Sequence, residues 1–148
     1  MSLIAKNRRA WFDYEILEEF EAGIVLYGSE VKSIRDGRVQ LSGSYAKIQD
    51  GELYLINAHI SPYEKSRSES YNPLRDRKLL VKKIELNKLM KKTEIRGLTL
   101  VPTRMYFKGG WAKVAVGLAR GKKKADKRSS LKEQDARREM DRERKRYT

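Results

Sequence analysis

The chain has 148 residues and a formal net charge of +14, and it contains no cysteine. This length suits one globular domain, and the lack of cysteine excludes disulfides, zinc–thiolate sites and cysteine nucleophiles. No apolar run approaches the ~20 residues that cross a membrane, and the N-terminus lacks the apolar core of a signal peptide. We therefore expect a cytoplasmic protein whose charge favours nucleic acid as partner, ahead of an anionic membrane surface or an acidic protein.

The first part of the chain predicts short strands around one helix. Alternating apolar residues favour a strand over residues 11–20, and Gly23 indicates a turn or bulge before the strand resumes over 24–27. Ser29 is a candidate N-cap for a short helix that ends at Asp36-Gly37.

The middle of the chain predicts a hairpin and then a long loop. Asp50-Gly51 is a strong two-residue turn signal between strands over 45–49 and 52–57. Residues 61–77 form a long polar stretch, which we interpret as a mobile loop.

The last part of the folded region predicts a helix and two strands. After a short strand over 78–81, apolar spacing favours an amphipathic helix over 86–93. Two strands over 98–107 and 111–118 follow, joined by Lys108-Gly109-Gly110, and Pro102 inside the first predicts an edge position or a bulge.

These elements together predict a mainly β fold. About six short antiparallel strands with two or three flanking helices favour a small barrel of the oligonucleotide-binding (OB) type over residues 1–118. Residues 119–148 carry 13 Lys/Arg against 6 Asp/Glu and almost no large apolar side chain. We expect this basic tail to be disordered in free solution and to fold as a helix on a polyanion.

Catalytic and metal-binding patterns are weak. The single histidine, His59, has no nucleophile or ligand partner at a known spacing. The glycine-rich stretch 117–122 is one residue too short for a phosphate loop and lacks its Ser or Thr. Glu18, Glu19 and Glu21 lie on one predicted strand, which cannot aim consecutive carboxylates at one ion. We therefore expect no cofactor, no metal and no enzymatic activity.

Binding patterns are better represented. On the last strand, Trp111 and Lys113 share the face opposite three apolar residues, and an aromatic beside a cation can stack on a base and neutralise a phosphate. The alternative is that Trp111 covers a sheet edge and Lys113 is solvated. Lys6, Asn7, Arg8 and Arg9 are candidates for a phosphate clamp, unless they belong to a frayed terminus.

Several motifs together resemble one family. They run in order over nearly the whole chain: Asn7-Arg8-Arg9-Ala10, Glu19–Ile24, Gly28–Arg35, Ser44-Tyr45, Arg77–Leu80, Trp111–Val114 and Gly117–Arg128. The chain resembles small protein B (SmpB), the bacterial family that binds transfer-messenger RNA (tmRNA, also called SsrA).

The resemblance implies trans-translation. The protein would grip the tRNA-like domain of tmRNA and deliver it to a ribosome stalled without a stop codon. Its tail would enter the vacant messenger channel of the small subunit as a helix. The chemistry would be left to alanyl-tRNA synthetase, elongation factor Tu and the ribosome, with no membrane involved and the protein a monomer.

The resemblance also assigns residues. RNA-contacting positions of the family fall on Asn7, Glu21, Leu80, Lys82 and Lys113. The positions implied for the decoding centre are Gly121, Lys122, Lys123, Lys124, Asp126, Lys127 and Arg128. Two departures stand out: Ala125 replaces an aromatic or histidine of some members, and Phe12 replaces a histidine. Ala125 cannot stack on a base, so neighbouring charged side chains would have to replace that contact with the decoding centre.

Two other functions fit the composition. One is a basic ribosome-associated OB-type protein with no tmRNA role. The other is a basic interaction protein of a membrane surface or a nucleus. The tail argues against the membrane, because Leu131 and Met140 are too sparse to form an inserting face.

Overall fold

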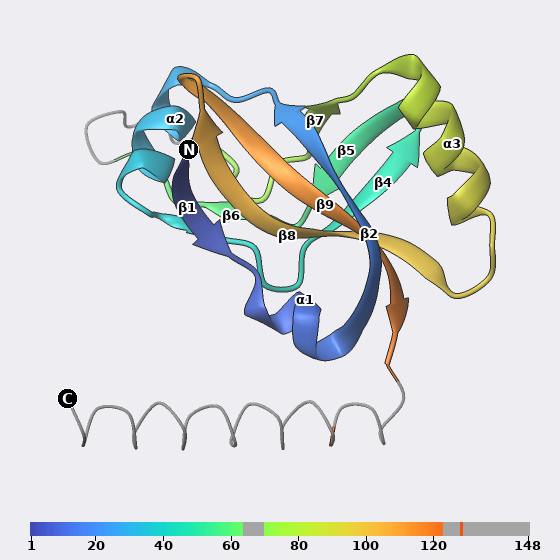
Figure 1. Ribbon diagram of the computed structural model, residues 1–148. Coiled ribbons are helices and arrows are strands. Elements are labelled where there is room, and N and C mark those ends of the chain that lie inside the picture. The colour runs from blue at the N-terminus through green and yellow to red at the C-terminus, as the bar shows by residue number, and fades with distance from the viewer. Residues whose placement is uncertain (64–69, 123–127, 129–148) are drawn as a thin grey trace.

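The computed structural model describes residues 1–63, 70–122 and 128. This part of the chain folds into nine strands and three helices (Figure 1). Their bounds are β1 Ser2–Lys6, α1 Arg8–Asp13, β2 Tyr14–Ile24, α2 Gly28–Arg35, β3 Val39–Gln40, β4 Tyr45–Gln49, β5 Glu52–Ile56, β6 His59–Ile60, β7 Arg77–Leu80, α3 Lys83–Thr93, β8 Leu98–Lys108 and β9 Trp111–Gly121.

Six of the strands form a nearly closed ring. The order is β8-β4-β5-β7-β2-β9, and β9 pairs back onto β8, with every pairing antiparallel. Strands β4 and β8 pair through a single residue pair, whereas the pairings of β2 with β9 and of β8 with β9 extend along most of these strands. β1 extends the sheet beyond β8, whereas β3 and β6 form a separate small sheet. The predicted mainly β fold with a near-barrel and flanking helices is confirmed.

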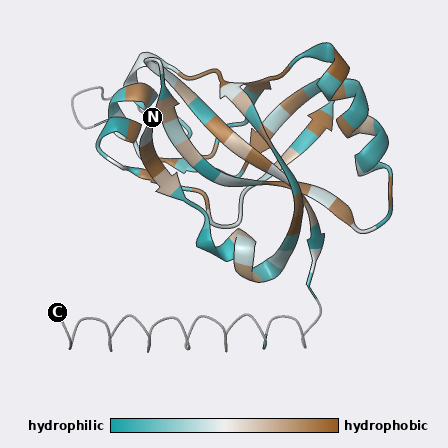
Figure 2. Cartoon of the chain, in the orientation of Figure 1, coloured by the Kyte–Doolittle hydropathy of each residue, from teal (hydrophilic) through white to brown (hydrophobic). Residues whose placement is uncertain are grey.

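The core fills the ring. Alternating bands of hydrophobic and hydrophilic residues mark the strands in Figure 2, as expected when one face is buried. Val114, Val116 and Leu118 point into the main hydrophobic cluster, as the sequence predicts for the last strand. The other face of β9 is also covered near its C-terminal end, because Ala119 packs with Ala10 of α1 and with Val101.

The strand predicted over residues 11–20 is wrong at its start. Residues 11–13 belong to α1, and β2 begins at Tyr14. The cause is Asn7, whose Oδ1 accepts the backbone N–H of Ala10 at 3.2 Å and so caps the helix. A short capped helix outweighs the local alternation of apolar residues.

The turn predicted at Gly23 and the strand predicted over 24–27 are also wrong. β2 runs without interruption through Ile24, and its irregularity lies between Ile16 and Glu18. The helix that follows starts one residue before the predicted cap, Ser29. Its N-cap is Tyr27, whose backbone N–H donates to the Glu30 carboxylate at 2.9 Å.

The predicted hairpin turn at Asp50-Gly51 and the predicted irregularity at Pro102 are both confirmed. Asp50 and Gly51 both have positive φ angles, of 52° and 73°, and join β4 to β5 as a hairpin. Pro102 marks a bulge, because the pairing of β8 with β9 shifts register between Pro102 and Arg104.

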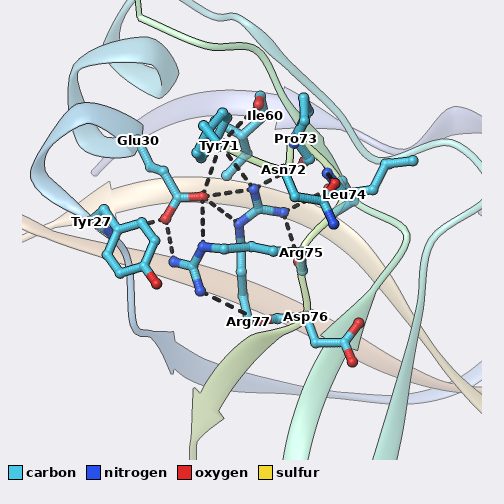
Figure 3. A network of polar contacts seen from close by, with 11 residues as sticks. Tyr27, Glu30, Ile60, Tyr71, Asn72, Pro73, Leu74, Arg75, Asp76 and Arg77 are labelled. Atoms are coloured by element: carbon cyan, nitrogen blue, oxygen red, sulfur yellow. Dashed lines mark hydrogen bonds and ion pairs between the residues drawn. The ribbon is translucent and has the colours of Figure 1, made fainter. Parts of the chain in front are cut away.

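The predicted loop over residues 61–77 extends too far, because its last residue already belongs to β7. Arg77 opens β7 and is fully buried, and residues 71–75 are tied to α2 through polar contacts (Figure 3). A charged side chain is buried here because a buried carboxylate faces it, which a polar sequence pattern cannot reveal. Residues 64–69 lie outside the described part of the chain.

The end of the folded region extends into the predicted tail. Ala119, Arg120 and Gly121 continue β9 and pair with β2. The rest of the tail, apart from Lys122 and Arg128, lies outside the described residues. Among the helices that the structure describes, none has the length and apolarity to cross a membrane.

Candidate nucleic-acid interface

Three of the residues predicted from the sequence, Leu80, Trp111 and Lys113, lie together on the outer face of β7, β2 and β9. Gly23 of β2 pairs with Leu80 of β7 on one side and with Lys113 of β9 on the other. Together with Trp111 they line a hollow of about 400 Å³. Trp111 and Leu80 are 74% and 52% exposed, so an apolar, aromatic surface with a cation in its middle faces solvent. We call Glu21, Leu80, Trp111 and Lys113 the β2–β9 face.

Gly23 leaves room for the Leu80 side chain at this hollow. A Cβ at this position would lie 3.4 Å from the Leu80 Cβ and 3.7 Å from its Cδ1, in ordinary contact. Because glycine has no side chain, Leu80 packs closely over the β2 backbone, with Lys113 on the other side of Gly23.

Glu21 lies two residues before Gly23 on the same strand face. It accepts a hydrogen bond of 2.5 Å from the Tyr106 hydroxyl and one of 3.4 Å from Lys108 Nζ. The Tyr106 hydrogen bond lowers the pKa of Glu21, and the charges of Lys108 and Lys113 add to this. Burial and the same hydrogen bond raise the pKa of Tyr106 to about 12. Glu21 is thus held as an anion that can only accept hydrogen bonds.

Arg8 belongs to a second, basic hollow. It lines about 410 Å³ together with Lys6, Trp11 and Arg104, and with Glu19 and Thr103, which are hydrogen-bonded to each other. Lys6 and Arg104 are directly opposite each other on β1 and β8. Like charges in that position repel each other, so a bound polyanion would stabilise the pair. We call Lys6, Arg8 and Arg104 the basic hollow.

Asn7 lies in the interior rather than on the surface. Its Nδ2 donates to the carbonyls of Pro102 at 2.8 Å and Leu41 at 3.3 Å, while its Oδ1 caps α1. The side chain is 3% exposed. Its hydrogen-bonding groups are therefore occupied in holding α1 and β8 together, which positions the neighbouring Arg8.

Arg9 and Lys82 lie apart from both hollows. Arg9 is exposed and pairs with Asp13 at 2.9 Å, one helical turn away. Lys82 is the N-cap of α3 and lines a further hollow with Lys88 and Lys92. The sequence-predicted residues therefore do not form one continuous site.

The comparisons with known proteins agree over nearly the whole length. The family model described as SmpB protein matches residues 4–146. The chain belongs to the SmpB family. A relative described as SsrA-binding protein, from Carboxydothermus hydrogenoformans, is 55% identical over 139 residues, which cover 94% of this chain and 93% of the relative.

Other members of the SmpB family give the same result. An SsrA-binding protein from Thermosynechococcus vestitus is 55% identical, covering 96% of this chain and 94% of its own. One from Geobacillus kaustophilus is 52% identical, covering 95% and 90%. A chain of the solved structure described as "tmRNA-SmpB: a journey to the center of the bacterial ribosome" superposes with a TM-score of 0.69 at 51% identity, covering 88% of this chain and 95% of that one.

The root of the tail in this SmpB-family chain is fixed against α1. Gly121 ends β9 opposite Tyr14, and the backbone N–H of Lys122 donates to the Asp13 carbonyl at 2.9 Å. Lys122 Nζ donates to the Trp11 carbonyl at 3.0 Å. Arg128 is exposed. Lys123, Lys124, Ala125, Asp126 and Lys127 lie outside the described residues.

Metal-ligating side chains do not cluster in the described part of this SmpB-family chain. Over residues 1–63 and 70–122, no three His, Cys, Asp or Glu side chains are grouped to hold a metal. His59 pairs with Gln40 in the small β3–β6 sheet and is half-buried. Glu18 and Glu19 have separate partners, Lys92 at 2.6 Å and Thr103 at 3.1 Å.

Sequence reasoning missed three side chains that border the candidate interface. Arg104 completes the basic hollow, and Tyr106 with Lys108 holds Glu21. Their positions depend on the pairing of β8 with β1 and β9, which residue spacing alone does not give. The one available signal was Pro102, whose predicted bulge changes the direction of the residues that follow it.

Proposed function

We propose that the protein is an RNA-binding adaptor that holds the tRNA-like domain of tmRNA on the β2–β9 face. The observation that carries this is the shared hollow of Leu80, Trp111 and Lys113, with ionised Glu21 beside it. An exposed ring offers stacking to an unpaired base, and the lysine offers a charge to its phosphate. A carboxylate that only accepts can recognise base amino groups or a ribose 2′-hydroxyl.

The basic hollow is a separate, second contact surface for RNA in this proposal. Lys6, Arg8 and Arg104 carry three positive charges around one depression that Glu19 also lines, and the net positive charge suits a phosphate backbone rather than base edges. Asn7 positions Arg8 by capping α1, whereas Arg9 and Lys82 lie apart from both hollows and add positive charge on α1 and beside α3. The proposed division is base contacts at the β2–β9 face and phosphate contacts in the basic hollow.

The ribosomal part of the function rests on the tail. Curated relatives are described as SsrA-binding proteins, and a solved relative is described in the setting of the bacterial ribosome. In this proposal an OB-type barrel delivers tmRNA, as a cytoplasmic monomer, to a stalled ribosome. Residues from Gly121 to Arg128 then probe the vacant messenger channel. Alanyl-tRNA synthetase and elongation factor Tu act on the same RNA complex, and this protein binds rather than catalyses.

Discrimination between RNA structures tests the proposal. We expect the tRNA-like fragment of tmRNA to bind more tightly than an RNA duplex of equal length at ~0.15 M salt, where unspecific charge attraction is screened. Filter binding or fluorescence anisotropy measures both dissociation constants. Equal affinities would favour the alternative, a basic RNA-binding protein of the ribosome without a tmRNA role.

A further inference from the structure

A further hollow of about 500 Å³ borders the segment that joins β2 to α2. Its aromatic lining comes from Tyr27, Tyr63 and Tyr71, and Arg75 lies among them. This volume falls in the range of about 300–1,000 Å³ that is typical of small-ligand pockets. None of the sequence-predicted site residues contributes to it.

The exposed part of the hollow is suited to a flat ring. The Arg75 guanidinium stacks 3.9 Å from the centre of the Tyr27 ring, and Tyr27 is still 58% exposed. Lys32 Nζ lies 5.4 Å from the centre of the Tyr63 ring. Tyrosine rings and stacked guanidinium groups are the surfaces on which proteins hold unpaired bases.

The floor of the hollow is rigid because it is built on a buried ionic cluster. Glu30 binds Arg77 and Arg75, and its Oε2 accepts the Tyr71 hydroxyl at 3.0 Å (Figure 3). One carboxylate faces two guanidinium groups, so the cluster keeps a net positive charge. Rigid aromatic walls and a positive floor together favour a nucleotide over an uncharged apolar ligand.

A short exposed segment of the chain separates this hollow from the hollow of the β2–β9 face. Leu26 and Val31 line the hollow of that face, while Tyr27 and Glu30 line this one. Val25 and Tyr27 are exposed on the segment between them. A single RNA strand that leaves Trp111 can therefore cross this segment and reach Arg75.

From these observations we infer that the Tyr27–Arg75 stack binds one unpaired nucleotide of the RNA. We call the hollow lined by Tyr27, Tyr63, Tyr71 and Arg75 the tyrosine pocket. The inference deepens the proposed function and rests on it for the identity of the RNA. The base packs against the Tyr27–Arg75 stack, and its phosphate lies within reach of the positive charges of Arg75 and Lys32.

Nuclear magnetic resonance of the full chain tests the pocket without any variant. We expect adenosine or uridine 5′-monophosphate to shift the aromatic resonances of Tyr27 and Tyr63 during a titration. Tyr45, an exposed tyrosine on β4, serves as the internal control. Shifts that are equal at Tyr45 and Tyr27, or absent from Tyr27 and Tyr63, would overturn the inference.

Variants connect the pocket to the RNA. Tyr27→Ala should weaken binding of the tRNA-like fragment at least about fivefold, as loss of one stacked base does. Tyr27→Phe keeps the ring and should bind as the unchanged chain does, and so should Tyr45→Ala. An unchanged affinity of Tyr27→Ala would contradict the inference. The proposed function fails separately, when the unchanged protein does not prefer the tRNA-like fragment over a duplex.

Discussion

Arg77 donates a hydrogen bond from Nε to Glu30 Oε2 at 2.8 Å, and both side chains are buried. Each of the other guanidinium nitrogens of Arg77 also has partners. Nη1 donates to the carbonyls of Ala58 and Arg75, and Nη2 to the carbonyl of Pro73 and the Tyr71 hydroxyl. All five N–H groups of this guanidinium are therefore satisfied, which links β7 to α2 across 47 residues of sequence.

Removal of one partner of this buried pair should destabilise the fold strongly. We expect Arg77→Met to lower the free energy of unfolding by about 3–5 kcal/mol, because Glu30 would keep a buried charge with fewer partners. Urea unfolding followed by circular dichroism measures the change.

A double-mutant cycle separates the pair from simple packing. Glu30→Leu combined with Arg77→Met leaves neither charge of the pair unmatched, so the double variant should lose less stability than the sum of the two single variants. Strictly additive losses would show that the two side chains do not stabilise each other.

The same pair predicts a loss of stability in acid. Burial raises the pKa of Glu30, but hydrogen bonds from Arg75, from the Tyr27 backbone and from Arg77 outweigh it and hold the pKa below its ordinary value of 4.5. The folded state thus binds this proton more weakly than the unfolded state. The contribution is fully present above pH ~4.5 and is lost as the pH falls through the lower, folded pKa.

Comparison with a variant tests the pH dependence. The free energy of unfolding of the unchanged protein should fall between pH 7 and pH 3 more steeply than that of Glu30→Gln, which has no proton to take up at this position. Parallel pH profiles for the two proteins would place the acid sensitivity elsewhere.

The sequence predicted the ring of strands better than it predicted this cluster. The Asp50-Gly51 turn, the Pro102 bulge and the inward face of the last strand depend on local rules, and all three are confirmed. Arg77 looked like part of a polar loop, because its partner Glu30 lies far away in sequence. Residue spacing likewise could not bring Tyr27 and Arg75 together.

The candidate site residues, too, could be predicted from the sequence only in part. Leu80, Trp111 and Lys113 do meet, as expected if they share a function. Asn7 was predicted from residue type alone to bind phosphate at the surface. Its side chain instead donates to the Pro102 carbonyl at the β-bulge and caps the start of α1. A polar residue can serve the fold or the ligand, and only its partners in three dimensions tell which.

Gly117 lies where two strands approach closely. A Cβ there would come within 2.9 Å of the Ile16 side chain and 3.3 Å of the Thr103 side chain. We expect Gly117→Ala to cost about 1–3 kcal/mol of stability through overpacking. Gly28→Ala is the matched control, because nothing lies within 4 Å of a Cβ at that position. Thermal unfolding of both variants measures the difference, and equal melting temperatures would contradict the predicted clash.

Lys113 should contribute to RNA affinity through its place on the β2–β9 face. We expect Lys113→Ala to weaken binding of the tRNA-like fragment by about 1–2 kcal/mol, the value of a charge-assisted contact. Lys47→Ala removes the same charge from an exposed position on β4 and should change binding much less. Anisotropy titrations of both variants at one salt concentration measure this, and equal losses would mean that net charge alone drives binding.

The boundary between the folded region and the tail predicts the outcome of two truncations. Ala119 is fully buried, and Arg120 and Gly121 pair with β2, so a chain ending at Leu118 loses the last part of β9. We expect that chain to melt at a lower temperature than one ending at Lys122, which keeps the hydrogen bonds to Trp11 and Asp13.

RNA binding completes this test. The chain ending at Lys122 should bind the tRNA-like fragment nearly as the full chain does, because the β2–β9 face is intact, yet it should not support tagging of stalled products. Loss of RNA binding in that chain would show that the tail contributes to binding of the tRNA-like fragment. A division of labour between body and tail would then be excluded. Equal melting temperatures of the two truncated chains would instead show that residues 119–122 do not stabilise the fold.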